Sequence, residues 1–349
     1  MLSQIVKDDI AELLEQKIDY EYFRNKTILV TGANGQIASY LVLFFLSLSK
    51  VLDDSIKVIA LVRNLDKAKG RFSEFLDSPS LEIIHQDVCL PIEIQDSADI
   101  VIHAASLASA FAMTNDPISI IKANTLGTLN TLEYCRRANS KKVMFLSTRE
   151  VYGDVAVDSI DENEIGKMNQ LDIRSCYPES KRVAENLLVC YQYQYNVSYV
   201  ITRIAHTYGP LMEIKNDGRV MADMINFIVN DNGIKLNSDG SAVRAFCYIT
   251  DTVAALLRIL ISAENQVYNV ANEQEPISIR ELAELLIELY PNRGLTLDVL
   301  CSNEAYRHGY LKTVRKELNT DKVRSLGWEP KISLREGLKR TCSYFGIEE

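Results

Sequence analysis

The pattern of apolar and polar positions divides the chain into three parts. Residues 3–23 are charged throughout but place their apolar side chains on roughly one face, which predicts an acidic amphipathic helix. After this segment, short apolar runs alternate with helical stretches, and towards the C-terminus the strands become short and irregularly spaced. We therefore expect an N-terminal helical extension (1–25), a first domain (26–210) and a smaller second domain (211–349).

Fully apolar runs predict the strands of the first domain. They occupy residues 26–32, 57–62, 81–87, 99–105, 142–148 and 197–203. Helices are expected at 37–50, at 117–138 and from Tyr177 onwards, and in the second domain near 219–230, 250–262 and 278–289. Apolar strands that alternate with helices indicate a parallel sheet covered on both faces. The predicted fold is α/β, a doubly wound parallel sheet with a smaller C-terminal α/β domain, and a late strand and helix can return to the first domain.

Composition and charge narrow the class of protein. Apolar residues make up 47% of the chain and charged residues 24%, which is ordinary for a soluble enzyme. A formal charge of −9 argues against nucleic acid as a partner. The first residues do not resemble a signal peptide, and the apolar run at 39–52 is shorter than the roughly 20 residues that cross a bilayer. We expect that run to form a buried helix, and we expect no membrane partner.

The cysteines indicate the redox environment. Seven of them lie dispersed without a CxxC pair, at positions 89, 135, 176, 190, 247, 301 and 342. An odd, dispersed set fits reduced thiols better than disulfides or a zinc site. The sequence therefore predicts cytoplasmic localisation and no metal site.

The stretch TGANGQIAS at 31–39 joins the first predicted strand to its helix. Gly32 and Gly35 allow a tight turn and let backbone N–H groups approach a pyrophosphate at the helix N-terminus. The last glycine of the usual dinucleotide fingerprint is replaced by Ala38, which is still small enough for close helix–strand packing. The loop predicts a Rossmann-type dinucleotide site, although a merely tight strand–helix turn would share this pattern.

The end of the second strand bears on the choice of dinucleotide. An acid that binds the ribose 2′-hydroxyl of NAD is usual there, but this strand ends at Arg63. Because an arginine can pair with a 2′-phosphate, the sequence favours NADP over NAD, unless Arg63 is a solvated surface cation. Asp87, at the end of the third strand, is expected either to accept a hydrogen bond from the adenine amino group or to cap a helix before Pro91.

Tyr177 and Lys181 form a Y-x-x-x-K pattern that places both side chains on one face of a helix. A tyrosine with its ordinary pKa of about 10 is a poor base at neutral pH. We expect the neighbouring ammonium to lower that pKa, so that the phenol can exchange a proton with a sugar hydroxyl or carbonyl. Thr148, at the carboxyl end of its strand, is expected to share this proton. The spacing alone also fits a plain surface pair, and Asn124 is either a cofactor contact or a buried helix amide.

The order and spacing of these motifs resemble the extended short-chain dehydrogenase/reductase family, which contains nucleotide-sugar epimerases, dehydratases and decarboxylases. The resemblance covers about residues 26–345 and rests on TGANGQIAS, HQDV (85–88), VIHAAS (101–106), KANTLGT (122–128), STREVYG (147–153), YPESK (177–181), RIAHTYGP (203–210) and LGWEP (326–330). It implies catalysis by Thr148, Glu150, Tyr177 and Lys181. The cofactor-binding residues expected with it are Gly32, Gly35, Gln36, Ile37, Arg63, Asp87, Val88, Ala104, Ala105, Ser106 and Asn124, together with Tyr177 and Lys181.

The stretch STREVYG separates branches of this family. In the family that this chain resembles, the position of Arg149 is an acid in the sugar-nucleotide 4,6-dehydratases and typically a serine in the UDP-glucuronate decarboxylases. Arg149 therefore argues against water elimination, whereas Glu150 is kept and is expected to handle a proton or to orient the sugar. The segments 215–229 and 239–251 look closest to the decarboxylase branch.

Four charged or polar positions and one apolar position are expected to bind the substrate. In the decarboxylase branch an arginine that matches Arg244 faces the substrate's phosphates or carboxylate. His206 replaces the usual asparagine of R-x-x-N-x-Y-G-P, and it is expected to donate to a diphosphate unless it is structural. The full set is Arg149, His206, Arg219, Val220 and Arg244, and surface charges are the alternative for Arg219 and Arg244.

Two reactions fit these motifs. The first is an internal hydride cycle at sugar C4 of a nucleotide sugar, in which a 4-keto intermediate permits either loss of a C5 carboxylate from a UDP-uronate or epimerisation. The second is net NADPH-dependent reduction of a 4-keto-6-deoxy sugar nucleotide. A non-catalytic dinucleotide-binding protein is disfavoured because Thr148, Tyr177 and Lys181 are all present. The resemblance also implies a homodimer formed through helices of the cofactor domain.

Overall fold

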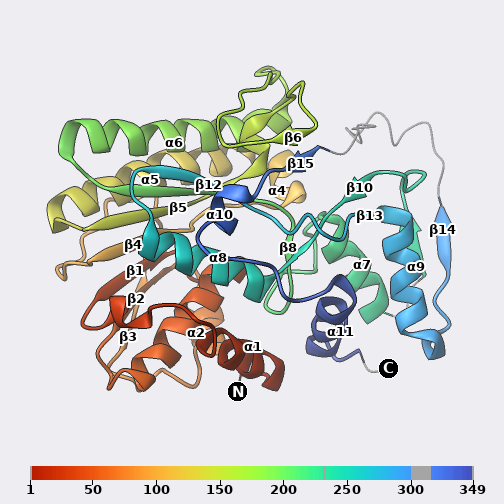
Figure 1. The fold of residues 1–349 in the computed structure, drawn as a ribbon, viewed down its shortest axis with the longest axis horizontal. Helices are drawn as coiled ribbons and strands as arrows, with labels where there is room; N and C mark the ends of the chain where they lie inside the picture. The colour runs from red at the N-terminus through yellow and green to blue at the C-terminus, as the bar shows by residue number, and fades with distance from the viewer. Residues whose placement is uncertain (1, 231–232, 300–315, 348–349) are drawn as a thin grey trace.

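The computed structural model describes residues 2–230, 233–299 and 316–347, and a seven-stranded parallel sheet forms its centre (Figure 1). The strands run in the order β12-β7-β5-β4-β1-β2-β3, and every neighbouring pair is parallel. Their bounds are Thr27–Thr31 (β1), Lys57–Val62 (β2), Leu81–His85 (β3), Ile100–His103 (β4), Lys142–Thr148 (β5), Tyr199–Ile204 (β7) and Gln266–Val270 (β12). The order reverses between β1 and β4, and doubly wound sheets bind ligands at such a switch point.

Helices cover both faces of the sheet because its strands are apolar on both sides. On one face α5 (Pro117–Ala138) packs against α6 (Cys176–Tyr195), and on the other α2 (Gln36–Val51) packs against α8 (Ile249–Ser262) (Figure 1). The predicted doubly wound α/β fold is confirmed. The parallel register places Thr31 beside His103 and Thr148 beside Ile204, so the carboxyl ends of four strands meet at one edge.

Short strand pairs and helices form the C-terminal part of the chain, on the right of Figure 1. They are α7 (Val220–Val229), β9 (Ile234–Leu236), β10 (Val243–Arg244), β13 (Ile277–Ser278), α9 (Ile279–Leu289), η4 (Pro291–Arg293), β14 (Leu297–Val299) and α11 (Leu334–Tyr344). The remaining elements are α3 (Leu65–Arg71), α4 (Ala110–Asn115), η2 (Arg149–Tyr152), β6 (Ser159–Ile160), η3 (Ile173–Ser175), β8 (Thr207–Tyr208), β11 (Cys247–Tyr248), β15 (Glu317–Leu318) and α10 (Asp321–Arg324). The helices predicted in this part of the chain are confirmed.

The N-terminal extension differs from the single helix predicted for residues 3–23. Helix α1 spans Gln4–Leu14, and the short helix η1 follows only at Tyr20–Phe23. The hydroxyl group of Tyr20 donates to the carbonyl of Leu13, and its ring packs against Phe44 of α2 at 5.4 Å between centroids. These two contacts hold Tyr20 against the core, and the chain turns after α1 so that they can form.

A buried carboxylate attaches α1 to the rest of the molecule. Asp9 is fully buried and accepts hydrogen bonds from the hydroxyls of Tyr40 (2.7 Å) and Tyr248 (2.9 Å) and from the guanidinium of Arg340 (3.0 Å). Burial raises the pKa of Asp9, and its three hydrogen-bond partners oppose that rise. Because the partners belong to α2, β11 and α11, this one side chain joins the first helix to both halves of the structure.

The apolar run at 39–52 lies almost entirely in α2, whose side chains are buried in the main core, as predicted. Within the described ranges no helix combines the length and apolar character that a bilayer crossing requires. The described cysteines are free thiols at Cys89, Cys135, Cys176, Cys190, Cys247 and Cys342. Cys301 lies outside the described residues.

Candidate active site

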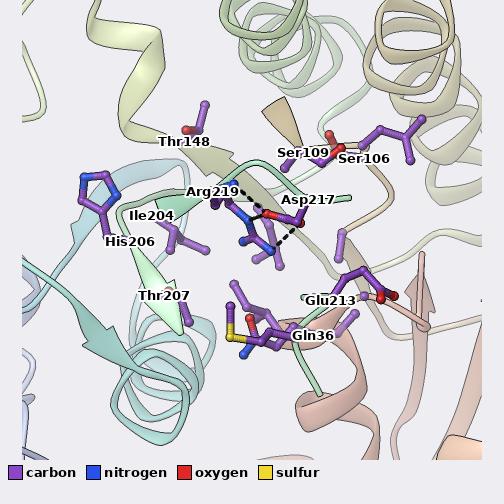
Figure 2. Close-up of a pocket in the computed structure, with 18 of the residues that line it drawn as sticks. Gln36, Ser106, Ser109, Thr148, Ile204, His206, Thr207, Glu213, Asp217 and Arg219 are labelled. Carbon is purple, nitrogen blue, oxygen red and sulfur yellow. Dashed lines mark hydrogen bonds and ion pairs between the residues drawn. The ribbon is translucent and has the colours of Figure 1, made fainter. Parts of the chain in front are cut away.

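A cavity of about 520 Å³ lies beside the carboxyl ends of β1, β4, β5 and β7. Residues of the loops that follow these strands line it together with residues from the segment 211–221 and Phe246. Figure 2 shows Thr148, His206, Asp217 and Arg219 among them. The predicted residues that line it are Gly35, Gln36, Ile37, Ala104, Ser106, Thr148, Arg149, Glu150, Tyr177, Lys181, His206, Arg219 and Val220. The fold thus brings residues from widely separated motifs to a single site.

The glycine loop forms the floor of this cavity. Gly32 has a φ of +65°, and a Cβ on it would lie 2.6 Å from the Cα of Ala105. Only glycine permits this approach between the loop after β1 and the loop after β4. Gly35 then caps α2, which directs the first N–H groups of that helix towards the cavity. The amide of Gln36 donates to the carbonyls of Gly209 (2.9 Å) and Pro210 (3.1 Å), which ties the start of α2 to the segment that follows β8.

Two polar atoms at this end of the cavity fit a dinucleotide. Among the described residues, Asn34 Oδ1 and Ser106 Oγ are buried without a hydrogen-bond partner, and so is Asn124 Oδ1, which does not line the cavity. Asn124 is fully buried and its amide donates to Ser180 Oγ at 2.9 Å, so it supports α6 as a buried helix amide. The predicted contact Val88 lies against α5, where a Cβ on Gly127 would come within 2.8 Å of it. Unpaired buried acceptors beside a glycine floor are the features that a bound dinucleotide would satisfy.

Arg63 and Asp87 stand away from the lining of the cavity. Both side chains are substantially exposed, at 56% and 41%, and they lie 3.9 Å apart as an ion pair. Asp87 also accepts a hydrogen bond from the backbone N–H of Cys89 at 2.8 Å, which forms a turn rather than the start of a helix. The alternative prediction that Asp87 caps a helix is therefore wrong.

Tyr177 faces Thr148 across the cavity wall. The exposed fractions of Tyr177 and Thr148 are 6% and 7%, and both side chains line the cavity. Burial raises the pKa of Tyr177 above its ordinary value, and the carboxylate of Glu150 raises it further, while the Thr148 hydroxyl and the charge of Arg219 lower it. The prediction that the neighbouring ammonium of Lys181 lowers this pKa is wrong for the protein alone, because burial is the largest influence and Lys181 is not among the groups that act on the phenol.

Lys181 points towards strand β5 instead. Its ammonium donates to the carbonyl of Leu146 at 2.7 Å and lies 4.4 Å from the centre of the Phe145 ring. Burial lowers the pKa of Lys181 to about 7, and the carboxylate of Glu185 opposes that change. Glu185 is itself held by an ion pair with Arg203 at 2.7 Å, so a buried salt bridge lies behind the lysine.

A glutamate and an unpredicted arginine lie near the phenol. Glu150 lines the cavity and is in contact with solvent there. Burial of its carboxyl group by the surrounding protein raises its pKa, and the charges of Arg174 and then Arg149 lower it. Arg174 belongs to η3, three residues before Tyr177, and sequence analysis did not select it. Its position in the turn that leads into the Tyr177 helix was the available signal.

Three arginines surround His206. The charges of Arg149, Arg244 and Arg219, after burial itself, lower the pKa of His206 to about 3. Asp217 holds Arg219 through two contacts, at 2.5 Å and 3.0 Å, as the dashed lines in Figure 2 show. Asp217 also escaped prediction, although it stands only two residues before Arg219. Arg244 does not line the cavity directly, but it is close enough that Arg149 lowers its pKa. The charges of Arg149 and Arg244 favour an anion on this side of the site, while Asp217 already pairs with Arg219.

The sheet, the glycine loop and the polar group at Thr148, Tyr177 and Lys181 together define an extended short-chain dehydrogenase/reductase. The chain belongs to the NAD dependent epimerase/dehydratase family, whose model matches residues 28–271. It is an enzyme of this family, whose members include nucleotide-sugar epimerases, dehydratases and decarboxylases.

Relatives with known names fall within the same group. UDP-glucuronic acid decarboxylase 5 of Arabidopsis thaliana is 33% identical over 90% of this chain and 87% of its own. The solved UDP-glucose 4-epimerase of Thermotoga maritima is 26% identical, has a TM-score of 0.74 and matches 92% of this chain and 98% of its own. The UDP-glucuronic acid 4-epimerase of Bacillus cereus, solved in complex with NAD, shares the fold with a TM-score of 0.76 at 22% identity, over 92% of this chain and 98% of its own.

Proposed function

We propose that the protein decarboxylates UDP-glucuronate or a closely similar UDP-uronate through an internal hydride cycle at sugar C4. The observation that carries this proposal is the cluster of arginines around His206: Arg149 and Arg219 line the cavity that also contains Tyr177, and Arg244 lies behind them. A substrate with both a diphosphate and a sugar carboxylate has the anionic groups that such a cluster attracts. The similarity to a UDP-glucuronic acid decarboxylase, which is 33% identical over 90% of this chain, supports the same choice.

Different residues of the cavity would have different roles in this reaction. A bound NAD(P) supplies reversible hydride transfer at the sugar carbon. Tyr177 and Thr148 both line the cavity, and their hydroxyls would hold the proton of the C4 oxygen between them. The raised pKa of Tyr177 keeps the phenol protonated at neutral pH in the protein alone, which suits donation to a keto oxygen. Glu150 would orient the sugar, and the arginines would bind its anionic groups.

The preference for NADP that Arg63 predicts stays a prediction. Arg63 pairs with Asp87 at 3.9 Å, and a 2′-phosphate would have to compete with that carboxylate. We propose that the chain binds NAD or NADP at the glycine loop, with Arg63 as the residue that distinguishes them. Titration of the two dinucleotides against wild type and Arg63→Ser would test this, because a contact with the 2′-phosphate predicts weaker binding of NADP alone in the variant.

Exposed apolar side chains on α5 and α6 support a homodimer. They include Ile118 (59% exposed), Leu126 (44%) and Leu129 (37%) on α5, and Val183 (49%) and Val189 (45%) on α6. These two helices pack together on one face of the sheet, so a second copy could cover both at once (Figure 1). Sedimentation analysis should show a dimer in the wild type and a monomer in a Leu126→Glu, Leu129→Glu double variant.

The decisive experiment is mass spectrometry of the products formed from UDP-glucuronate. Decarboxylation predicts loss of carbon dioxide without net consumption of dinucleotide. A C4 epimer of unchanged mass would point to epimerisation. Steady oxidation of added NADPH with a 4-keto-6-deoxy sugar nucleotide would replace the proposal with the reductase alternative. Tyr177→Phe is the matched control, because it removes only the phenolic oxygen.

A further inference from the structure

Arg149 and His206 follow neighbouring strands that end at the same edge of the sheet. In the parallel register Thr148 lies opposite Ile204, so the residues after each strand emerge side by side. Nη1 of Arg149 lies 3.3 Å from Nε2 of His206, and Nη2 donates to the carbonyl of Lys316 at 3.2 Å. The strand register therefore builds the contact between the guanidinium and the imidazole into the fold.

The chemistry of this contact fixes the proton on the imidazole. A guanidinium has only donors, so Nε2 of His206 must accept, and the neutral ring carries its hydrogen on Nδ1. Three arginines and burial lower the pKa of His206 to about 3, so the ring is uncharged at neutral pH. Within the described residues Nδ1 has no hydrogen-bond partner, and His206 lines the cavity.

The backbone and a second ring hold His206 in place. Its φ is +48°, a left-handed conformation that histidine tolerates better than most residues. Its carbonyl accepts a hydrogen bond from the N–H of Cys247 at 3.1 Å, and its ring lies 5.8 Å from that of Phe246. An imidazole fixed on several sides presents its remaining N–H in a defined direction.

We propose that Arg149 is a positioning residue that sets His206 as a neutral Nδ1–H donor to an anionic oxygen of the substrate. The inference rests on the proposed function, because it takes a nucleotide sugar as the occupant of the cavity. The guanidinium groups of Arg149 and Arg244 already repel each other, because Arg149 lowers the pKa of Arg244 in addition to burial. An uncharged donor among them adds a directed hydrogen bond without adding to that repulsion.

Nitrogen-15 NMR of the full chain, labelled at histidine, tests the first half of the proposal. The chain has four histidines, and His206→Asn identifies the signals of residue 206. In the wild type we expect an Nδ1-protonated ring that does not titrate between about pH 6 and 8. Arg149→Met keeps a stem of similar length but removes the donor and the cation, so the fixed tautomer should be lost and the pKa of His206 should rise. An Nε2-protonated ring in the wild type, or a ring unchanged by Arg149→Met, would overturn the inference.

Calorimetric titration with UDP and with UDP-glucuronate tests the second half. Loss of a hydrogen bond to a charged group corresponds to roughly 10- to 100-fold weaker binding. We expect Arg149→Met to weaken binding about tenfold less in a His206→Ala background than in the wild type, because the two residues act together. Strictly additive losses would contradict a positioning role. Weaker binding of UDP itself assigns the oxygen to the diphosphate, and an effect confined to UDP-glucuronate assigns it to the carboxylate.

The two proposals fail separately. A wild type with the expected tautomer and coupled binding that does not decarboxylate UDP-glucuronate would refute the proposed reaction and leave the role of Arg149 intact. Decarboxylation by a protein whose His206 is protonated on Nε2 would do the reverse. Arg149→Lys is the control for charge, because it keeps the cation but lacks the planar fork that contacts His206 and Lys316 together.

Discussion

Burial of Lys181 has a cost in stability that depends on pH. The side chain is 2% exposed, and burial lowers its pKa from 10.5 to about 7. Between these two pH values the unfolded chain binds a proton that the folded chain has released, so stability rises with pH across this window. The shift of 10.5 − 7 = 3.5 corresponds to about 5 kcal/mol of destabilisation below pH 7, at about 1.36 kcal/mol per pH unit.

Lys181→Met removes the cation and keeps a side chain of similar length. The hydrogen bond to the carbonyl of Leu146 is lost as well, which offsets roughly 1–3 kcal/mol of the gain. We therefore expect the variant to be inactive but more stable than the wild type, by about 2–4 kcal/mol at pH 6. The wild type should recover about 2.7 kcal/mol of that difference by pH 9, two units above the lowered pKa.

Urea denaturation of both proteins at these two pH values measures the effect. Every other titrating group is common to the two chains, so the difference between their free energies of unfolding isolates Lys181. A difference that stays constant from pH 6 to pH 9 would refute the reasoning, because it would mean that the folded lysine keeps an ordinary pKa.

Three further substitutions probe the site. Tyr177→Phe should lower the turnover of the nucleotide sugar by roughly 100- to 10,000-fold, because the proton donor is lost. Gly32→Ala should abolish binding in a dinucleotide titration, since a Cβ there would lie 2.6 Å from the Cα of Ala105 and the φ of +65° disfavours it. Glu185→Gln should destabilise the protein to urea by roughly 3–5 kcal/mol, because it leaves Arg203 buried without its anion; a loss below about 1 kcal/mol would show that the pair is effectively solvated.

The sheet and the glycine loop were predictable because their signals are local. Apolar strands, a periodic helix and glycines at a strand–helix turn each depend on a few consecutive residues, and the structure confirms their order. The carboxyl edge of a parallel sheet is also fixed by strand direction, which is why Thr148 and His206 could be expected to lie near one cavity.

Electrostatic effects at the site were not predictable in the same way. The spacing of Tyr177 and Lys181 suggested that the ammonium acts on the phenol, but the ammonium is directed towards Leu146 and burial dominates the pKa of both groups. Arg174 and Asp217 were missed because their importance comes from contacts between segments that helical or strand periodicity does not encode. The break after α1 likewise depends on an aromatic contact with a later helix.

The cluster around Asp9 bears on how the chain reaches its final state during synthesis. The helix that carries this carboxylate is synthesised more than 300 residues before its guanidinium partner at Arg340. The ion pair that completes this cluster therefore forms only after α11 has been made. Loss of α11 would leave Asp9 buried without its cation, and loss of α1 would deprive Arg340 of both Asp9 and Glu12.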